Sequence, residues 1–264
     1  MSLEGGAEPG VALSTRGLRR TFGDLVAVDG IDLEVPRGAL YGFLGPNGAG
    51  KSTTIKCLTG LLRPSAGEIR ILGMDPAAQP VEVKKKVGVM PEDLALFDRL
   101  TGAETLSFVG QVHGIAKETI QRRTEELLAL MDLAGARDAL IADYSHGMRK
   151  KISLAAALLP GPRLLFLDEP FEGIDAVASR QIKDLLASFT RGGGTIFLTS
   201  HILEIVERLS DHIGIIHKGR LVAQGPVEEL RTGARLGKTL EEIFLEIVGA
   251  SSAPTATLDW LGGP

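Results

Sequence analysis

The sequence has a single cysteine and no long apolar run. One cysteine, Cys57, excludes an internal disulfide and favours a reducing compartment, and we expect its side chain to be a small buried hydrophobe. A membrane-spanning helix needs about 20 apolar residues. The longest apolar run, residues 152–159, is interrupted by Ser153 and ends at Pro160. Any role at a membrane would therefore require a partner protein.

The chain also lacks a large net charge of either sign. The 264 residues contain 33 acidic and 29 basic side chains, which gives a formal net charge of -4. No overall positive field attracts this chain to nucleic acid or anionic lipid, so we expect no nucleic-acid partner. The N-terminus lacks the basic and apolar regions of a signal peptide. We expect a cytoplasmic protein with a disordered leader at residues 1–10 and a flexible tail at residues 249–264.

One glycine-rich stretch, residues 45–53 with the sequence GPNGAGKST, fits the phosphate-binding pattern of a glycine, four residues and Gly-Lys-Ser. An apolar stretch typical of a buried strand precedes it, and a stretch compatible with a helix follows it. Glycines let successive N–H groups turn toward phosphate oxygens at a helix N-terminus. We expect the following residues to bind the phosphates of a nucleotide: Gly45, Pro46, Asn47, Gly48, Ala49, Gly50, Lys51, Ser52 and Thr53.

Two side chains of this stretch suit phosphoryl chemistry. Lys51 would reach the β- and γ-phosphates, and the Ser52 hydroxyl would bind Mg²⁺. The alternative is a plain strand-to-helix turn that contains Gly-Lys-Ser by chance, and the strand and helix predicted around the stretch argue against it.

Two adjacent carboxylates, Asp168 and Glu169, follow an apolar stretch at residues 164–167. Neighbouring strand residues point to opposite faces, so two successive carboxylates would be unfavourable inside a core. At the carboxyl end of a parallel strand they would face the ligand crevice. The strand predicted at residues 195–199 brings His201 to the same edge of the sheet. An exposed Asp-Glu-Pro turn is the alternative.

The rest of the pattern predicts an α/β protein whose N-terminal part is an antiparallel sheet and whose middle is a helical block. Strands are predicted at residues 11–13, 18–22, 25–28, 31–35, 68–72, 87–90, 213–216 and 221–223. Helices are predicted at residues 148–159, 176–190, 202–209 and 239–248. Phe22 ends one early strand, where an exposed ring could stack on a purine base; a position in the core is the alternative.

The order of these motifs resembles the nucleotide-binding subunit of an ABC transporter, over residues 11–248. The resemblance rests on residues 45–53 as Walker A, residues 144–151 at the signature position, residues 164–169 as Walker B, residues 173–175 as the D-loop and His201 as the switch histidine. It implies a P-loop NTPase with a RecA-like core, an N-terminal antiparallel β-subdomain and an inserted α-helical subdomain near residues 93–160.

The resemblance also implies roles for individual residues. Asp168 would hold Mg²⁺, mostly through water, Glu169 would be the general base for the attacking water, and His201 would contact the γ-phosphate. Ser145 and Gly147 would contact the γ-phosphate of an ATP held by a second subunit. The chain would therefore have to dimerise, with a second copy of itself or with a paralogue.

Three positions depart from the commonest family pattern. His146 replaces a glycine of the signature and adds bulk. Glu92 stands where the Q-loop glutamine is expected, and it can still offer an oxygen to Mg²⁺. Phe22 replaces the usual adenine-stacking tyrosine and keeps the aromatic ring. The D-loop residue Asp175 completes the set expected around the nucleotide.

A methionine in the signature and the closing segment at residues 239–245 are similar to those of the ABC-2-type exporter branch, which has separate six-helix permeases. The resemblance implies an ATPase that uses ATP and Mg²⁺, dimerises on ATP and powers export through transmembrane permease subunits, peripheral on the inner face of the membrane. A soluble ABC ATPase of an assembly machine is the alternative. A P-loop kinase is a third hypothesis, and the signature, D-loop and His201 argue against it.

Overall fold

A computed structural model of the chain describes residues 10–230 and 239–248. The strands are β1 (Val11–Phe22), β2 (Leu25–Ile31), β3 (Glu34–Pro36), β4 (Leu40–Leu44), β5 (Ala66–Ile71), β6 (Val87–Met90), β7 (Leu164–Asp168), β8 (Thr195–Ser200), β9 (His212–His217) and β10 (Arg220–Pro226). The helices are α1 (Lys51–Leu58), α2 (Pro80–Lys84), α3 (Gly102–Val112), α4 (Lys117–Leu130), α5 (His146–Leu158), α6 (Ala176–Arg191), α7 (Leu203–Leu209), α8 (Val227–Leu230) and α9 (Leu240–Val248). No helix in these two ranges is long and apolar enough to cross a membrane.

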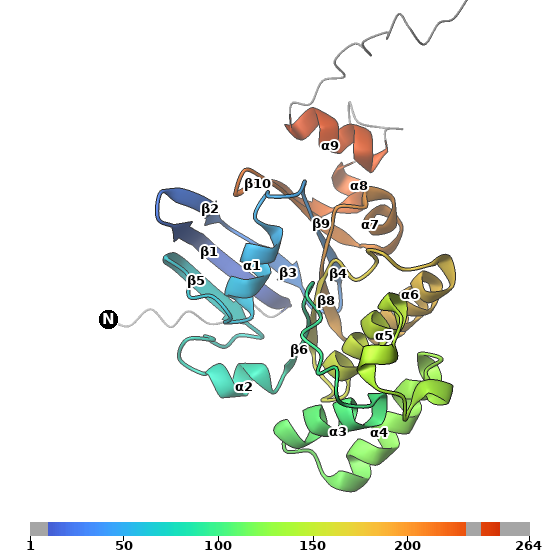
Figure 1. The fold of residues 1–264 in the computed structure, drawn as a ribbon. Coiled ribbons are helices and arrows are strands. Elements are labelled where there is room, and N and C mark those ends of the chain that lie inside the picture. The colour runs from blue at the N-terminus through green and yellow to red at the C-terminus, as the bar shows by residue number, and fades with distance from the viewer. Residues whose placement is uncertain (1–9, 231–238, 249–264) are drawn as a thin grey trace, which may run out of the picture.

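The strands form two sheets. The larger sheet has the order β10-β9-β4-β8-β7-β6, in which only the hairpin strand β10 runs antiparallel to its neighbour. In the smaller sheet β2, β3 and β5 all pair with β1 in antiparallel fashion. In Figure 1 the smaller sheet and helices α5 to α7 lie on opposite sides of the larger sheet. The predicted α/β class with an antiparallel N-terminal sheet is confirmed.

The predicted break between two early strands is wrong, because residues 11–22 form the single strand β1. Gly17, which suggested the break, has a φ of 57° within the strand, and the pairing register with both β2 and β5 shifts in this part of β1. A glycine in the left-handed region is typical of a bulge that bends a strand without ending it. The result is one long bent strand at the centre of the smaller sheet.

The two faces of the larger sheet carry different side chains. On one face Tyr41, Phe43 and Phe166 surround Phe197, with ring centroids 5.3 to 5.8 Å from that of Phe197. This aromatic cluster packs against α1 and the smaller sheet, and Cys57 of α1 is buried there as expected. Leucine and isoleucine side chains of the other face pack against α5, α6 and α7. Strands β4, β7 and β8 are buried along their whole length, as is typical of parallel strands covered on both faces.

The predicted helical block contains α3, α4 and α5, which pack together at one end of the molecule (Figure 1). Helix α5 begins two residues earlier than predicted, because the Ser145 side chain caps it by accepting a hydrogen bond from the Met148 N–H.

Helices α2 and α8 were not predicted, and α2 starts at Pro80, a residue suited to a first helical position. Most of the predicted leader and the whole predicted tail lie outside the described residues, so the domain boundaries stay predictions.

Strands β4, β7 and β8 are adjacent and parallel, so their carboxyl ends meet at one edge of the sheet. The glycine-rich loop follows β4, Glu169 follows β7 and His201 follows β8. The fold thereby brings three separate segments of the chain to one place, and the glycine-rich loop lies more than a hundred residues before the other two.

Candidate nucleotide site

The glycine-rich loop between β4 and α1 has a backbone that requires glycine. Gly50 has a φ of 109°, and a Cβ atom there would lie 2.5 Å from the Ala27 carbonyl oxygen. At Gly45 a Cβ atom would lie 2.5 Å from the carbonyl oxygen of Ile216. No side chain caps α1, and its first turn has no acidic residue. Its first N–H groups are therefore available to an anion such as a phosphate.

Lys51 is the first residue of α1, directly after this loop, and is 6% exposed. Its ammonium donates to the carbonyl oxygen of Gly45 at 2.8 Å and to that of Pro46 at 3.4 Å. It also lies 3.4 Å from Oε1 of Glu169. The positive charge is thus held between the loop and the carboxylate that follows β7, where the phosphates of a bound nucleotide would compete for it.

Three oxygen ligands converge beside the loop. The Ser52 hydroxyl lies 3.2 Å from Oε2 of Glu92 and 3.5 Å from Oδ1 of Asp168. Among the described residues, no three His, Cys, Asp or Glu side chains form a metal-binding group on their own. Mg²⁺ commonly uses one or two carboxylates and takes its other ligands from water and substrate phosphates. This donor set therefore fits Mg²⁺ bound together with a nucleotide.

Asp168 is 2% exposed at the end of β7. Burial raises the pKa of its carboxyl group, a hydrogen bond from the Thr199 hydroxyl opposes the shift, and the charge of Glu92 adds to it. A buried carboxylate in this setting is stabilised by a nearby cation. The electrostatics of Asp168 thus agree with a role as a metal ligand.

Glu169 is 5% exposed, and each of its polar groups has a partner. Its N–H donates to the Thr199 hydroxyl at 3.1 Å, and its carbonyl accepts from Lys150 Nζ at 2.6 Å. Oε2 lies 3.0 Å from Nδ1 of His201 and accepts from the His201 N–H at 3.3 Å. With a φ of 49°, Glu169 turns the chain at the strand end, so its carboxylate and that of Asp168 share one site. This rules out the exposed-turn alternative.

Two residues in this arrangement, Thr199 and Lys150, were not predicted as site residues. Thr199 pairs with Asp168 in the register of β7 and β8, so aligning the two predicted strand ends would have found it. Lys150 is only 3% exposed in a helix that packs into the core. The sequence shows that Lys150 lies five residues after Ser145, but it does not show that the Lys150 ammonium donates to the Glu169 carbonyl.

The structure brings Lys51, Ser52, Glu92, Asp168, Glu169 and His201 together. Of the other predicted site residues, Gly45 and Pro46 contact this cluster by accepting hydrogen bonds from Lys51. The Ser145 and Asp175 side chains cap their own helices instead. Phe22 is 43% exposed at the end of β1, which rules out a core position, and the guanidinium of Arg20 lies 4.4 Å from its ring centroid.

The signature residues lie at the exposed start of α5. Ser145 caps the helix, and a Cβ atom built on Gly147 would have no neighbour within 4 Å. The His146 ring lies beside the D-loop, since a Cβ atom on Gly173 would be 3.1 Å from its Nε2. Asp175 caps α6 through the Ala178 N–H at 2.8 Å, and this hydrogen bond lowers the pKa of its carboxyl group.

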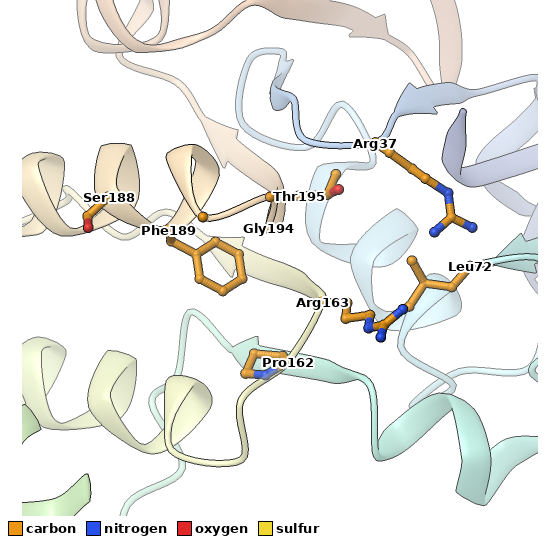
Figure 2. A pocket seen from close by; sticks show the side chains of 10 residues that line it. Arg37, Leu72, Pro162, Arg163, Ser188, Phe189, Gly194 and Thr195 are labelled. Atoms are coloured by element: carbon orange, nitrogen blue, oxygen red, sulfur yellow. The ribbon is translucent and has the colours of Figure 1, made fainter. Parts of the chain in front are cut away.

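A separate pocket of about 490 Å³ lies at the opposite, amino-terminal edge of the parallel strands (Figure 2). Arg37 and Arg163 line one side of it, and Phe189 lines the other. The triglycine at residues 192–194 forms part of its wall, and a Cβ atom on Gly194 would lie 2.3 Å from the Phe189 ring. These glycines, predicted as a plain loop, are thus distant from the phosphate loop.

Comparison with known proteins shows to which family the chain is similar. Residues 28–172 match the family model described as ABC transporter. The daunorubicin/doxorubicin resistance ATP-binding protein DrrA of Streptomyces peucetius is 40% identical over 225 residues, which cover 85% of this chain and 68% of the relative. The Nod factor export ATP-binding protein I of Cupriavidus metallidurans is 37% identical over 232 residues, which cover 88% and 76%. A solved structure of an ATP binding subunit of an ABC transporter matches with a TM-score of 0.84 and 31% identity, over 89% of this chain and 99% of that chain.

Proposed function

Since the chain belongs to the ABC transporter family, and to its ATP-hydrolysing subunits, we propose that it works as one half of an ATP-dependent dimer that powers export through separate permease subunits. The observation that carries this proposal is the cluster of Lys51, Ser52, Asp168, Glu169 and His201 at one edge of the sheet. Phosphoryl transfer needs charge compensation and an aligned water, and this cluster has groups for both.

Each residue of the cluster has a distinct task in the proposal. The loop N–H groups and Lys51 bind the phosphates, which draws the ammonium away from Glu169 and leaves that carboxylate free to accept a proton from water. His201, already hydrogen-bonded to Glu169, fixes the orientation of the carboxylate. Ser52, Asp168 and Glu92 would hold Mg²⁺, which when bound would neutralise charge on the β- and γ-phosphates. The glutamate at position 92 adds a negative charge and so tunes the affinity for the metal.

The exposed signature favours a site completed by a second subunit. Ser145 and the open face of Gly147 lie at the N-terminus of the 13-residue helix α5, and neither contacts the cluster of its own chain. A helix N-terminus is suited to an anion. We assign these residues, with Asp175, to an ATP held by the partner in a sandwich of two copies or of this chain and a paralogue.

An apolar groove of about 440 Å³ beside the nucleotide site is the proposed contact with the permease. It lies between the segment that follows Glu92 and helix α3. Phe97 and Phe108 line it, are 57% and 45% exposed, and pack edge to face with centroids 5.4 Å apart. Exposed aromatic side chains of this kind mark interaction surfaces. Because Glu92 precedes the groove, nucleotide-dependent movement at the metal site would reach the permease directly.

The export direction and the ABC-2-type branch are proposed from the relatives, one of which is named for drug resistance and another for Nod factor export. A dimer bound to permeases would be peripheral on the inner face of the membrane. These relatives do not favour the assembly-machine alternative, and membership of the transporter family argues against a small-molecule kinase.

The test is capture of the membrane partner. Tagged Glu169→Gln protein is purified from detergent-solubilised native cells with ATP and Mg²⁺, and co-purifying proteins are identified by mass spectrometry. The matched control carries Phe97→Asp in addition, which places a charge in the groove. The proposal expects a polytopic membrane protein that is lost from the control. Recovery of soluble proteins alone would favour an assembly machine instead.

A further inference from the structure

Lys150 is a buried charged side chain that the proposed chemistry does not use. It lies in the second turn of α5, is 3% exposed and donates to the Glu169 carbonyl at 2.6 Å. Burial lowers the pKa of its ammonium, and the negative charges of Glu172 and Glu169 oppose the shift. Because Lys150 is buried and makes a short hydrogen bond to one carbonyl, its ammonium makes a specific contact and is not a solvated surface charge.

The carbonyl that Lys150 binds belongs to a residue with an unfavourable backbone conformation. Glu169 has a φ of 49°, which lies in the left-handed region that is unfavourable for residues other than glycine. Its N–H is held by Thr199, and its carbonyl accepts from Lys150 and, at 3.3 Å, from the Glu172 N–H. The bond from Lys150 is the shorter of the two and is assisted by charge. Without it the direction of the Glu169 side chain would be less well fixed.

The same lysine joins Glu169 to the signature. Ser145 caps α5, and Lys150 lies five residues further, which is about 7 Å along the helix axis. Helix α5 is packed into the core, where Ile152, Leu154 and Ala155 are fully buried. Because a packed helix shifts as a unit, a small displacement at Ser145 would move Lys150 with it.

We propose that Lys150 is a positioning residue that ties the backbone of Glu169 to α5, so that the general base of one site responds to the nucleotide which this chain's signature contacts in the other site. The inference rests on the proposed function, in which Ser145 contacts the ATP held by the partner subunit. Its consequence is that the two ATP sites of a dimer are coupled through one side chain in each copy.

The first test is Lys150→Met in the full chain, with steady-state ATPase measured over ATP concentration. Loss of alignment should lower kcat roughly 10- to 100-fold while KM and ATP-driven dimerisation change little. Lys150→Arg, which can still donate to the carbonyl, should recover most of the rate. Lys183→Met is the matched control, because Lys183 lies over the Phe171 ring of the same loop without contacting Glu169. An unchanged kcat in a folded Lys150→Met protein would overturn the proposal.

The second test asks whether Lys150 acts through Glu169. In a Glu169→Gln background, Lys150→Met should cost little further rate, because the group that it positions is already lost. Multiplicative losses would show an independent role and overturn the proposal. A Glu169→Gln protein with wild-type turnover would instead contradict the proposed function itself, so the two failures are distinguishable.

The third test addresses coupling to the signature. Ser145→Ala should lower kcat in the wild-type background, and it should lower kcat by a smaller factor when Lys150 is already methionine. Equal factors in both backgrounds would mean that no signal from Ser145 passes through Lys150, and the coupling would be rejected.

Discussion

The phosphate-loop half of the site and the signature half differ in how far one chain completes them. Lys51 and Glu169 are 6% and 5% exposed, and their charged groups are already paired with each other and with backbone or histidine partners. Ser145 is exposed and only caps its own helix, and Gly147 faces open space. The phosphate-loop half, which is the catalytic half in our proposal, is preorganised by the fold, whereas the signature half depends in that proposal on a partner subunit.

The difference has an electrostatic cause. A charge that is removed from water must be paired, or its burial is strongly unfavourable. Glu169 meets this condition within the chain, because Lys51 of α1 and His201 after β8 both lie against its carboxylate. Ser145 and Gly147 need no such charged partner, because Ser145 is a neutral exposed side chain that caps its own helix and Gly147 has no side chain.

Loss of the Lys51 ammonium should have a severe effect on ATP turnover. Lys51→Ala deprives the phosphates of their main positive charge and leaves the buried Glu169 without its ammonium partner, so we expect ATP turnover to fall by at least about 100-fold. ATPase assays and nucleotide binding by calorimetry measure this. Lys56→Ala, in the last turn of the same helix, should retain activity. Near-normal turnover by Lys51→Ala would remove the loop from the site.

Neutralising Glu169 should separate binding from hydrolysis. Glu169→Gln keeps the shape and the contact to His201 but cannot accept a proton, so hydrolysis should slow by roughly 10² to 10⁴-fold while ATP still binds. Size-exclusion chromatography with ATP should then show an accumulated dimer. Glu118→Gln, an acidic residue in the first turn of α4, is the control. An unchanged rate would place the general base elsewhere.

Phe22 is an exposed residue at the end of β1 that we expect to stack on the base of the nucleotide. One face of its ring carries the Arg20 guanidinium, so a purine base would stack on the other face. Phe22→Ala should raise the KM for ATP about tenfold and leave kcat nearly unchanged, because stacking of this kind acts on binding. Phe22→Tyr, which restores the common family residue, should behave like wild type. An unchanged KM in Phe22→Ala would remove Phe22 from base recognition.

The sequence allowed the positions of the residues in the phosphate-loop half to be predicted, because these residues follow strand ends. Glycine spacing, the position of Asp168 and Glu169 after an apolar stretch, and His201 after the next strand all fix the edge of the sheet at which side chains meet. The confirmed fold follows from the same apolar patterns. Element boundaries were less well predicted: Gly17 suggested a break but forms a bend within β1.

The contacts between distant segments could not be predicted. The bond from Lys150 to the Glu169 carbonyl depends on how α5 packs against the loop after β7, and no local pattern encodes that packing. The left-handed backbone of Glu169 has no signal in the residue type either, since glutamate rarely adopts it. The place of His146 beside Gly173 depends equally on tertiary packing.

His146 gives the smallest expected effect and sharpens the comparison between the two halves. It is an exposed signature residue, and its ring lies beside Gly173 of the D-loop. Because His146→Gly removes this bulk and restores the common family residue, closure of the dimer should be easier and basal turnover should rise roughly twofold, the size expected of a surface change. His146→Gln, which keeps bulk at this position, should stay near the wild-type rate. If glycine and glutamine give the same turnover as histidine, the ring beside Gly173 has no influence on closure of the dimer, and His146 does not constrain the signature half.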